Sequence, residues 1–228
     1  MSPYTSTLPS TITPETSLAA LATRFAGASR VFQRHQLDFC CRGAVSLADA
    51  CRERRLATAD VLAELQAAVS PTQGRDWSEA STADLLAHLV DHFHQDHRQE
   101  LPRLLAMAEK VERVHAGRAG CPVGLAAALH EVQQDLEQHM QKEEQVLFPL
   151  LLADPHALVT GPVLCLTHEH EGHGQNLAHL RHLAHDFVPP EHACGTWQAL
   201  YLGLAAFERA VMEHIHLENH VLFPRCRT

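Results

Sequence analysis

The chain has 228 residues, of which 46% are hydrophobic and 20% are charged, a balance typical of folded globular proteins rather than disordered ones. Its formal net charge is −9, from 18 basic and 27 acidic residues. This argues against nucleic acid as a partner, because nucleic-acid-binding proteins present a basic face. No apolar run approaches the roughly 20 residues that a membrane-spanning helix needs, so no membrane association is expected.

The counts of cysteine and histidine narrow the chemistry. The polar N-terminus lacks the basic start and apolar stretch of a secretory leader, and the seven cysteines are an odd number. We therefore expect reduced thiols and a cytoplasmic location. Of the 19 histidines, all but His35 lie at or after His88. This shift predicts a domain boundary, and it points to metal binding beyond that boundary because neutral imidazole is a common metal ligand.

In chain order, the first part of the sequence predicts a tail, a small helical domain and a linker. Residues 1–16 are rich in Ser, Thr and Pro and are expected to be disordered. Over residues 17–70, short pieces of helical periodicity predict a domain of three or four short helices, one of which starts at Ser46 with the Ser46 side chain as its cap. Residues 71–78 are predicted to be a linker, because Pro and Gly interrupt the pattern there.

Residues 79–228 are predicted to form an antiparallel bundle of four long helices. The expected helices start near Ser81, run from about 124 to 152, run from Pro162 to about 186, and run from about 196 to 222. Pro102 is expected to kink the first helix or to end its first half. No stretch alternates with a period of two, so no strand is predicted.

The bundle region contains an internal repeat. Glu137–Pro149 matches Met212–Pro224 at an offset of 75 residues, and both segments end in Val-Leu-Phe-Pro. Upstream, His92–His97 matches His168–His173 at an offset of 76 residues. The bundle is therefore expected to consist of two helix pairs built on the same plan.

Polar residues occupy positions in these helices where the periodicity of a buried seam requires apolar ones. The seam of the second helix reads Leu129, Val132, Leu136, His139, Glu143, Val146 and Leu150. The seam of the third helix reads Leu166, His170, His173, Leu177 and Leu180, and that of the fourth reads Leu204, Phe207, Val211, His214, Glu218 and Val221.

One buried histidine is more often satisfied by hydrogen bonds within the core than by a metal. Burying a polar group without compensation costs about 2–7 kcal/mol, so several together would consume the roughly 5–15 kcal/mol of net stability of a domain. The seam therefore predicts a dinuclear metal centre. No thiolate lies in it, which argues against iron–sulfur clusters and structural zinc. Two imidazoles and one carboxylate for each ion, with open positions, favour non-haem iron.

The seam residues resemble the ligands of the hemerythrin-like di-iron bundle. From about residue 17 the chain is also similar to the iron–sulfur cluster repair di-iron proteins, or repair of iron centres family, which pair such a bundle with a short domain bearing a Cys-Cys-x-Gly motif. Asp38-Phe-Cys-Cys-Arg-Gly43 matches that motif, and Lys142–Pro149 and His214–Asn219 match the bundle motifs. The resemblance implies an all-α fold, with a small helical domain before a hemerythrin-like four-helix bundle.

The resemblance also implies two non-haem iron ions bridged by oxygen. The ligands that it carries over are His94, His139, Glu143, His170, His214 and Glu218. His97 and His173 share the seam; we assign them to hydrogen bonds with ligands or bound water, and an added ligand from either is left open.

The function that the resemblance implies is repair of iron–sulfur clusters damaged by nitric oxide or oxidative stress, by iron donation. Its partners would be damaged iron–sulfur proteins, with nitric oxide or oxygen as small ligand. Buffering or sensing of these gases and reduction of nitric oxide at the paired irons are alternatives. Whether the protein is an enzyme, and whether it forms a homodimer, is left open.

Cys40 and Cys41 are assigned the reactive role in handling iron. Without the resemblance, packing and function would be equally good explanations of this pair; with it, function is favoured. Adjacent cysteines close a disulfide only across a strained peptide, so no permanent disulfide is expected. Arg42 and the following helix N-terminus are expected to lower the pKa of the thiols. The other five cysteines show no ligand spacing.

Overall fold

The computed structural model describes residues 12–25, 27–68, 76–153 and 159–226. Within these ranges the regular elements are helices, and the only strand-like feature is an isolated bridge between Ser17 and Ser46. The predicted all-α fold class is confirmed. No helix in the described ranges is both long enough and apolar enough to cross a membrane.

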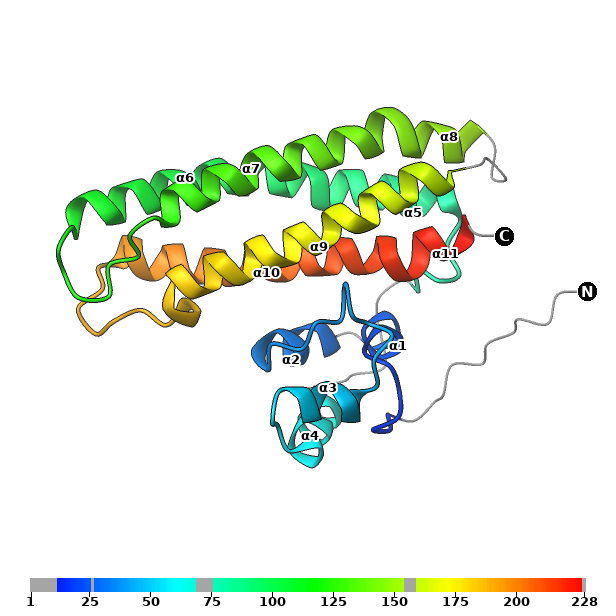
Figure 1. Cartoon of the computed structure of the whole chain (residues 1–228), viewed down its shortest axis with the longest axis horizontal. Coiled ribbons are helices and arrows are strands. Elements are labelled where there is room, and N and C mark those ends of the chain that lie inside the picture. The colour runs from blue at the N-terminus through cyan, green and yellow to red at the C-terminus, as the bar shows by residue number, and fades with distance from the viewer. Residues whose placement is uncertain (1–11, 26, 69–75, 154–158, 227–228) are drawn as a thin grey trace, which may run out of the picture. The chain divides into compact units, whose positions relative to one another are not determined.

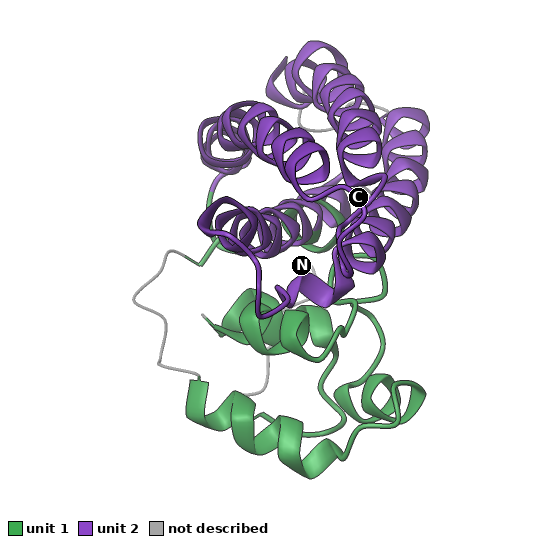
Figure 2. Cartoon of the chain, turned by 90° about the vertical axis from the view of Figure 1, so that its left-hand side faces the viewer, with its two compact units in different colours: residues 1–80, 216–221 green, residues 81–215, 222–228 purple. Residues whose placement is uncertain are grey.

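The chain divides into two compact units (Figure 2). The first comprises residues 1–80 together with His216–Val221, and the second comprises residues 81–215 and 222–228. Most of the linker predicted over residues 71–78 lies outside the described residues, which exclude 69–75. The segment 216–221 continues the last long helix of the chain, yet it groups with the first unit.

The sequence predicts three or four short helices in the first unit, and its described residues contain four: α1 (Leu18–Arg24), α2 (Ala28–Arg34), α3 (Leu47–Glu53) and α4 (Thr58–Ala68). Ser46 caps α3, because its Oγ accepts from the backbone N of Asp49 at 3.1 Å, as expected of this residue type at a helix start. The carbonyl of Thr16 accepts from the backbone N of Leu47 at 3.0 Å. Of the tail predicted over residues 1–16, residues 12–16 lie within the described residues and residues 1–11 lie outside them.

Four long helical stretches make up the bundle (Figure 1). The first consists of α5 (Thr82–His88), the π-helical η1 (Leu89–His94) and α6 (Gln95–Val114), and the second of α7 (Leu125–Lys142), the π-helical η2 (Glu143–Leu147) and α8 (Phe148–Ala153). The third is α9 (Thr160–Leu183), which is followed by the short 3-10 helix η3 (His185–Phe187). The last consists of α10 (Gly195–Leu217), the π-helical η4 (Glu218–Leu222) and α11 (Phe223–Arg225).

The predicted helix boundaries hold to within a few residues, with one exception. Ser81 caps the first stretch, with its Oγ accepting from the backbone N of Asp84 at 3.1 Å. The third stretch begins at Thr160 rather than at Pro162. Pro102 lies inside α6 and the chain stays helical through it, so the expectation that it could end the helix is wrong.

The three π-helical turns occur where the chain carries predicted metal ligands. His94 is the last residue of η1, Glu143 the first of η2 and Glu218 the first of η4. Single π turns inside α-helices are uncommon and concentrate at functional sites. In η2 and η4 a cause lies in the Val-Leu-Phe-Pro repeat, because a proline ring clashes with the carbonyl four residues earlier, which falls inside the π turn in each case.

The π turn at η2 corrects the seam predicted for the second helix. Val146 and Leu150, predicted to be buried, are 48% and 42% exposed, whereas Leu147 and Leu151 are 0% and 4% exposed. A π turn adds one residue to the helical repeat, so every position after Glu143 shifts by one around the helix. The predicted seam residues of α9 are all buried.

Candidate metal centre

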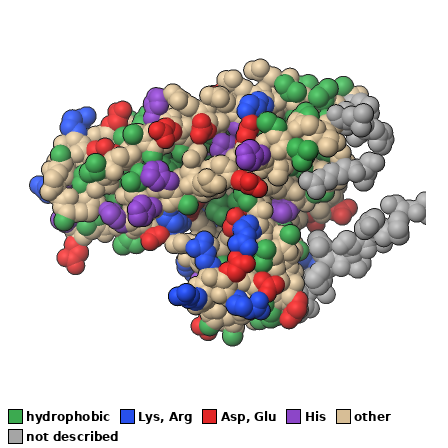
Figure 3. Space-filling model, viewed as in Figure 1, with side chains coloured by type: hydrophobic (Ala, Val, Ile, Leu, Met, Phe, Trp, Pro, Cys, Tyr) green, Lys and Arg blue, Asp and Glu red, His purple; other side chains and the backbone are tan. Residues whose placement is uncertain are grey.

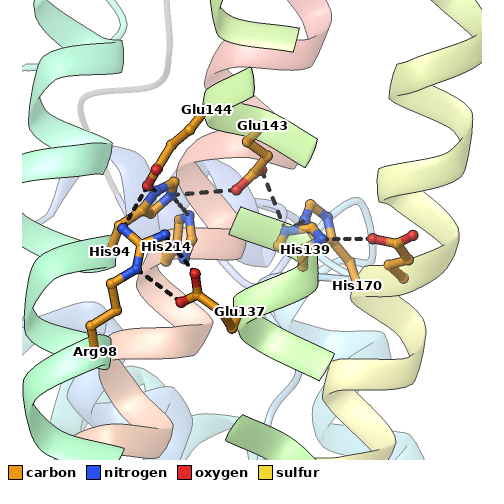
Figure 4. Close-up of polar contacts among 9 residues, drawn as sticks. His94, Arg98, Glu137, His139, Glu143, Glu144, His170 and His214 are labelled. Carbon is orange, nitrogen blue, oxygen red and sulfur yellow. Dashed lines mark hydrogen bonds and ion pairs between the residues drawn. The ribbon is translucent and has the colours of Figure 1, made fainter. Parts of the chain in front are cut away.

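Two groups of buried side chains converge in the bundle. One consists of His94, Glu143, His214 and Glu218, and the other of His139, Glu143, His170 and Glu218. Within each group the candidate ligand atoms all lie within 4.8 Å of one another. The structure thus brings together all six residues that the sequence and the resemblance select, and all are at most 1% exposed. Figure 4 shows five of them pointing toward one another from the four long helical stretches, with His139 and Glu143 on the same stretch.

Glu143 lies between the two groups and faces both. Its Oε2 is 3.3 Å from Nε2 of His94, and its Oε1 is 3.3 Å from Nε2 of His139. Each oxygen of the carboxylate is therefore directed to a different imidazole (Figure 4). This is the arrangement in which one carboxylate bridges two cations.

The paired imidazole nitrogens have the spacing of ligands to a common ion. Nε2 of His94 lies 3.2 Å from Nε2 of His214, and Nε2 of His170 lies 3.2 Å from Nε2 of His139. Imidazole nitrogens bind metals at about 2.1 Å, so two of them on one ion at angles of about 90–110° are about 3.0–3.4 Å apart. The observed spacing falls inside that interval for both pairs.

The burial of Glu143 also fits a site that holds cations. Its carboxylate is fully buried, and neither oxygen makes a hydrogen bond with suitable geometry in the described part of the chain, although both lie 3.3 Å from an imidazole nitrogen. A buried charge without compensation costs several kcal/mol. Divalent ions in the two groups would remove this cost, so the residues present fit a dinuclear centre.

Two outer carboxylates orient the imidazoles. Nδ1 of His94 lies 2.6 Å from Oε1 of Glu144, and Nδ1 of His139 lies 3.0 Å from Oε2 of Glu169. A carboxylate accepts hydrogen bonds, so each Nδ1–H donates and each Nε2 keeps its lone pair for the centre. Carboxylate partners of this kind also make the ligating imidazole more basic.

Each outer carboxylate is held by a cation. Arg98 donates from Nη1 to Glu144 at 2.8 Å and also pairs with Glu137 (Figure 4), while Lys142 pairs with Glu169. The hydrogen bond from His139 lowers the pKa of Glu169 to about 2, against the opposing effect of burial. Burial acts to raise the pKa of Glu144, but the hydrogen bonds from Arg98 and His94 outweigh it and lower that pKa. Both groups are therefore anionic at neutral pH.

We expect Glu144→Ala and Glu169→Ala each to weaken ferrous iron binding by about 10–100-fold, the usual cost of removing the partner of a ligating histidine. The measurement is competition against a chelator of known affinity under anaerobic conditions. Both side chains are partly exposed, so the folded state should survive the change. Glu131→Ala, on the exposed face of α7, is the control, and an unchanged affinity in the Glu144 and Glu169 variants would remove the outer carboxylates from the site.

His97 and His173 belong to neither group. His173 is 5% exposed, its Nε2 has no hydrogen-bond partner among the described residues, and its ring centroid is 4.8 Å from that of His139. Burial, with smaller contributions from the neighbouring imidazoles, lowers its pKa to about 3. His173 is therefore a neutral imidazole beside the centre.

The Cys40–Cys41 pair corrects one expectation. Burial and the hydrogen bond shared with Cys41 raise the pKa of the Cys40 thiol well above its ordinary value, the hydrogen bond having the larger effect. Arg42, expected to favour thiolate, instead forms a two-point ion pair with Glu53 at 2.6 and 3.0 Å. The predicted lowering of the thiol pKa is therefore wrong for Cys40.

The glycine of the Cys-Cys-x-Gly motif is required by close packing. A Cβ at Gly43 would clash with the carbonyl of Phe39, the Nε2 of His220 and the Cβ of Ala19. Within the same compact unit, the Cys40 carbonyl accepts hydrogen bonds from Asn219 Nδ2 and His220 Nε2, each at 3.0 Å. The motif thus fixes the backbone of the cysteine pair against the segment that follows Glu218.

Sequence comparisons agree with this organisation. Residues 85–226 match the Hemerythrin HHE cation binding domain, and residues 14–69 match a domain of unknown function (DUF542) that is named ScdA_N. The chain is 44% identical over 210 residues to the Iron-sulfur cluster repair protein YtfE of Pectobacterium carotovorum, covering 92% of this chain and 95% of that protein. It is 39% identical over 211 residues to the Probable iron-sulfur cluster repair protein of Haemophilus influenzae, covering 91% and 95% respectively. The chain therefore belongs to the family of iron-sulfur cluster repair proteins that carry a hemerythrin HHE cation binding domain.

Proposed function

We propose that this protein repairs iron–sulfur clusters damaged by nitric oxide or oxidative stress, by donating iron from a di-iron centre. The centre would be held by His94, His139, Glu143, His170, His214 and Glu218. The observation that carries the proposal is the buried carboxylate of Glu143, whose two oxygens face two separate imidazole pairs. Such a site binds two ions together and leaves positions open for an oxygen bridge or a diatomic ligand.

The ligand types support release as well as binding. No cysteine belongs to either group, and imidazole and carboxylate give up ferrous iron more readily than a cage of thiolates does. The outer carboxylates Glu144 and Glu169 are partly exposed, so the shell around the ligands reaches solvent. Iron is the cargo in this proposal, and the chain's residues hold it, neutralise it and pass it on.

Gas buffering and nitric oxide reduction would use the bundle alone. The cysteine pair favours repair over both, because its backbone is hydrogen-bonded to Asn219, the residue after the proposed ligand Glu218. A gas buffer has no need of thiols held in this way, whereas transfer of iron to a thiolate-ligated cluster uses them.

The partners in this proposal are damaged iron–sulfur proteins, and the small ligand is nitric oxide or oxygen. Whether the protein forms a homodimer is left open.

Basic and acidic side chains lie next to each other on the face of the α1–α4 unit that Figure 3 shows. Examples are the Arg42–Glu53 and Arg52–Asp49 pairs. On the visible face, this mixed charge differs from the basic face that nucleic-acid-binding proteins present. None of the seven cysteines, all within the described residues, forms a disulfide, which supports a reducing, cytoplasmic location.

Transfer of labelled iron tests the proposal. The protein is loaded with ⁵⁷Fe and incubated anaerobically with an iron–sulfur enzyme whose cluster nitric oxide has damaged. We expect ⁵⁷Fe to appear in the restored cluster, by Mössbauer spectroscopy, as the client's activity returns. Protein bearing Glu143→Ala is the control that cannot load. Label that stays in the bundle while nitric oxide binds would identify a gas buffer and overturn repair, and stoichiometric conversion of nitric oxide would identify a reductase.

A further inference from the structure

A third cluster of potential metal ligands lies in the first unit, apart from the six bundle residues. Asp38, Cys40 and Cys41 present a carboxylate and two thiols within 4.8 Å of one another. Sγ of Cys40 is 3.7 Å from Sγ of Cys41 and 3.3 Å from Oδ1 of Asp38. The donor set combines one hard ligand with two soft ones, which suits a thiophilic divalent ion.

These distances correspond to the edges of a coordination tetrahedron. With metal–sulfur distances of about 2.3 Å, two thiolates on one tetrahedral ion are about 3.8 Å apart. With a metal–oxygen distance of about 2.0 Å, sulfur and oxygen are about 3.5 Å apart. The observed 3.7 and 3.3 Å are each within a few tenths of an ångström of these values, so the side chains need little rearrangement to bind an ion.

The fold holds this arrangement from several sides. Oδ1 of Asp38 accepts from the backbone N of Cys41 at 2.8 Å and of Arg42 at 3.3 Å, which closes the turn over the thiols. On the other side of the turn, Asn219 and His220 fix the carbonyl of Cys40. A turn of this kind explains the position of Asp38 by itself, but it does not require residues 40 and 41 to be cysteines with their thiols at ligand spacing.

The electrostatic surroundings of Cys40 favour the protonated thiol. The guanidinium of Arg42 is engaged by Glu53, and it does not lower the pKa of the Cys40 thiol, which burial, Cys41 and Asp38 all raise. The Cys40 thiol therefore keeps its proton at neutral pH unless an ion displaces it. Metal binding to thiols releases protons in this way.

Space for a fourth ligand lies beside the carboxylate. A pocket of about 120 Å³ is lined by Asp38, Arg42 and Glu53 together with Leu18, Val45 and Arg54. The pocket belongs to the first unit, and Asp38, the carboxylate of the cluster, is one of its lining residues. A side chain entering it would come next to this carboxylate.

We propose that Asp38, Cys40 and Cys41 form a three-ligand tetrahedral site for a thiophilic divalent cation, whose fourth position is left for a thiolate of another protein. One ion replaces two thiol protons, and no electron is transferred. The existence of the site stands on its own geometry. Its use as an intermediate binding site for ferrous iron that is transferred to a damaged cluster rests on the proposed function.

Cobalt(II) is the probe, because a thiolate ligand gives it a charge-transfer band in the near ultraviolet and tetrahedral geometry gives it intense visible bands. Full-length, reduced, iron-loaded protein is titrated with Co²⁺ under anaerobic conditions. We expect one equivalent to bind with both signatures and with release of about two protons. Cobalt that exchanges into the bundle gives no thiolate band, since neither bundle group contains a cysteine.

Matched variants locate the ion. Cys40→Ser and Cys41→Ser should each abolish tight cobalt binding. Asp38→Asn should weaken cobalt binding by roughly 10–100-fold. It should keep the fold, because the amide oxygen can still accept from the backbone of residues 41 and 42. Cys194→Ser removes an exposed thiol and should leave the cobalt site unchanged. Wild-type protein without the thiolate band, or a band that survives both Cys40→Ser and Cys41→Ser, overturns the site.

The two proposals fail separately. A cobalt band without transfer of ⁵⁷Fe to a client leaves the site standing and overturns repair. Transfer of ⁵⁷Fe without a cobalt band leaves repair standing and overturns the site. Circular dichroism of each variant distinguishes loss of a ligand from loss of the fold.

Discussion

Glu143→Ala is expected to lose both metal ions, whereas removal of an ordinary ligand would affect mainly one. The two oxygens of Glu143 lie 3.3 Å from the imidazoles of His94 and His139, which belong to different groups. Loss of this carboxylate would remove one ligand oxygen from each ion, together with the single negative charge that the two ions would share. Metal analysis of protein reconstituted with ferrous iron should therefore find a content near zero, against two ions per chain in the unaltered protein.

The stability of the metal-free variant separates a ligand from a structural group. Glu143 makes no hydrogen bond of suitable geometry among the described residues, so its removal relieves a buried charge, and metal-free Glu143→Ala should melt no lower than the metal-free parent. Loading should raise the melting temperature of the parent, because a ligand that binds only the native state stabilises it, and should not raise that of the variant. Glu131→Ala should behave as the parent. A fully loaded Glu143→Ala protein would exclude the bridging role.

The bundle and its polar cluster could be predicted because both depend on periodicity. Histidines and glutamates at seam positions are read directly from the spacing of apolar residues, and burial in the structure follows that spacing up to Glu143. Beyond it the prediction fails by one residue, with Leu147 buried in place of Val146. A constant helical repeat cannot represent a π turn, and only the repeated Pro149 and Pro224 hint at one.

The outer carboxylates could not be predicted from single positions, since Glu144 and Glu169 lie on half-exposed faces where glutamate is common. The internal repeat holds a clue, because the partner of Glu144 at the offset of 75 is Asn219. In the first copy, Glu144 accepts a hydrogen bond from Nδ1 of His94. In the second copy, Asn219 donates a hydrogen bond to the carbonyl of Cys40. The two copies have thus diverged in what their side chains bind.

The electrostatics of the cysteine pair depend on side-chain partners that neighbours in sequence do not reveal. Arg42 follows the pair directly, yet its guanidinium is engaged by Glu53, on α3. The Cys40 thiol lies 3.3 Å from Oδ1 of Asp38, and this carboxylate raises the thiol pKa rather than lowering it. A thiol in this setting is a poor nucleophile by itself and becomes a thiolate when a cation takes the place of its proton.

Cys40→Ser/Cys41→Ser is therefore expected to abolish repair while leaving the bundle loaded. Neither cysteine belongs to the bundle groups, so iron content and nitric oxide binding should equal those of the parent. Recovery of a damaged iron–sulfur enzyme should fall to the rate seen without the protein, because serine binds a soft ion far more weakly than thiolate does. The measurements are metal analysis, the nitrosyl absorption spectrum and client activity on one preparation.

The possible results of the double variant assign the roles of the two units. Recovery at the parental rate would remove the cysteines from the reaction and favour iron release directly from the bundle. Loss of iron together with loss of repair would mean that the hydrogen bonds from Asn219 and His220 to Cys40 help to position Glu218. The assignment of iron binding to the bundle and of iron transfer to the cysteines would then be wrong. Cys194→Ser, an exposed thiol in the other unit, should retain both properties. Loaded bundle with absent repair is the result that only a thiol-dependent transfer step predicts.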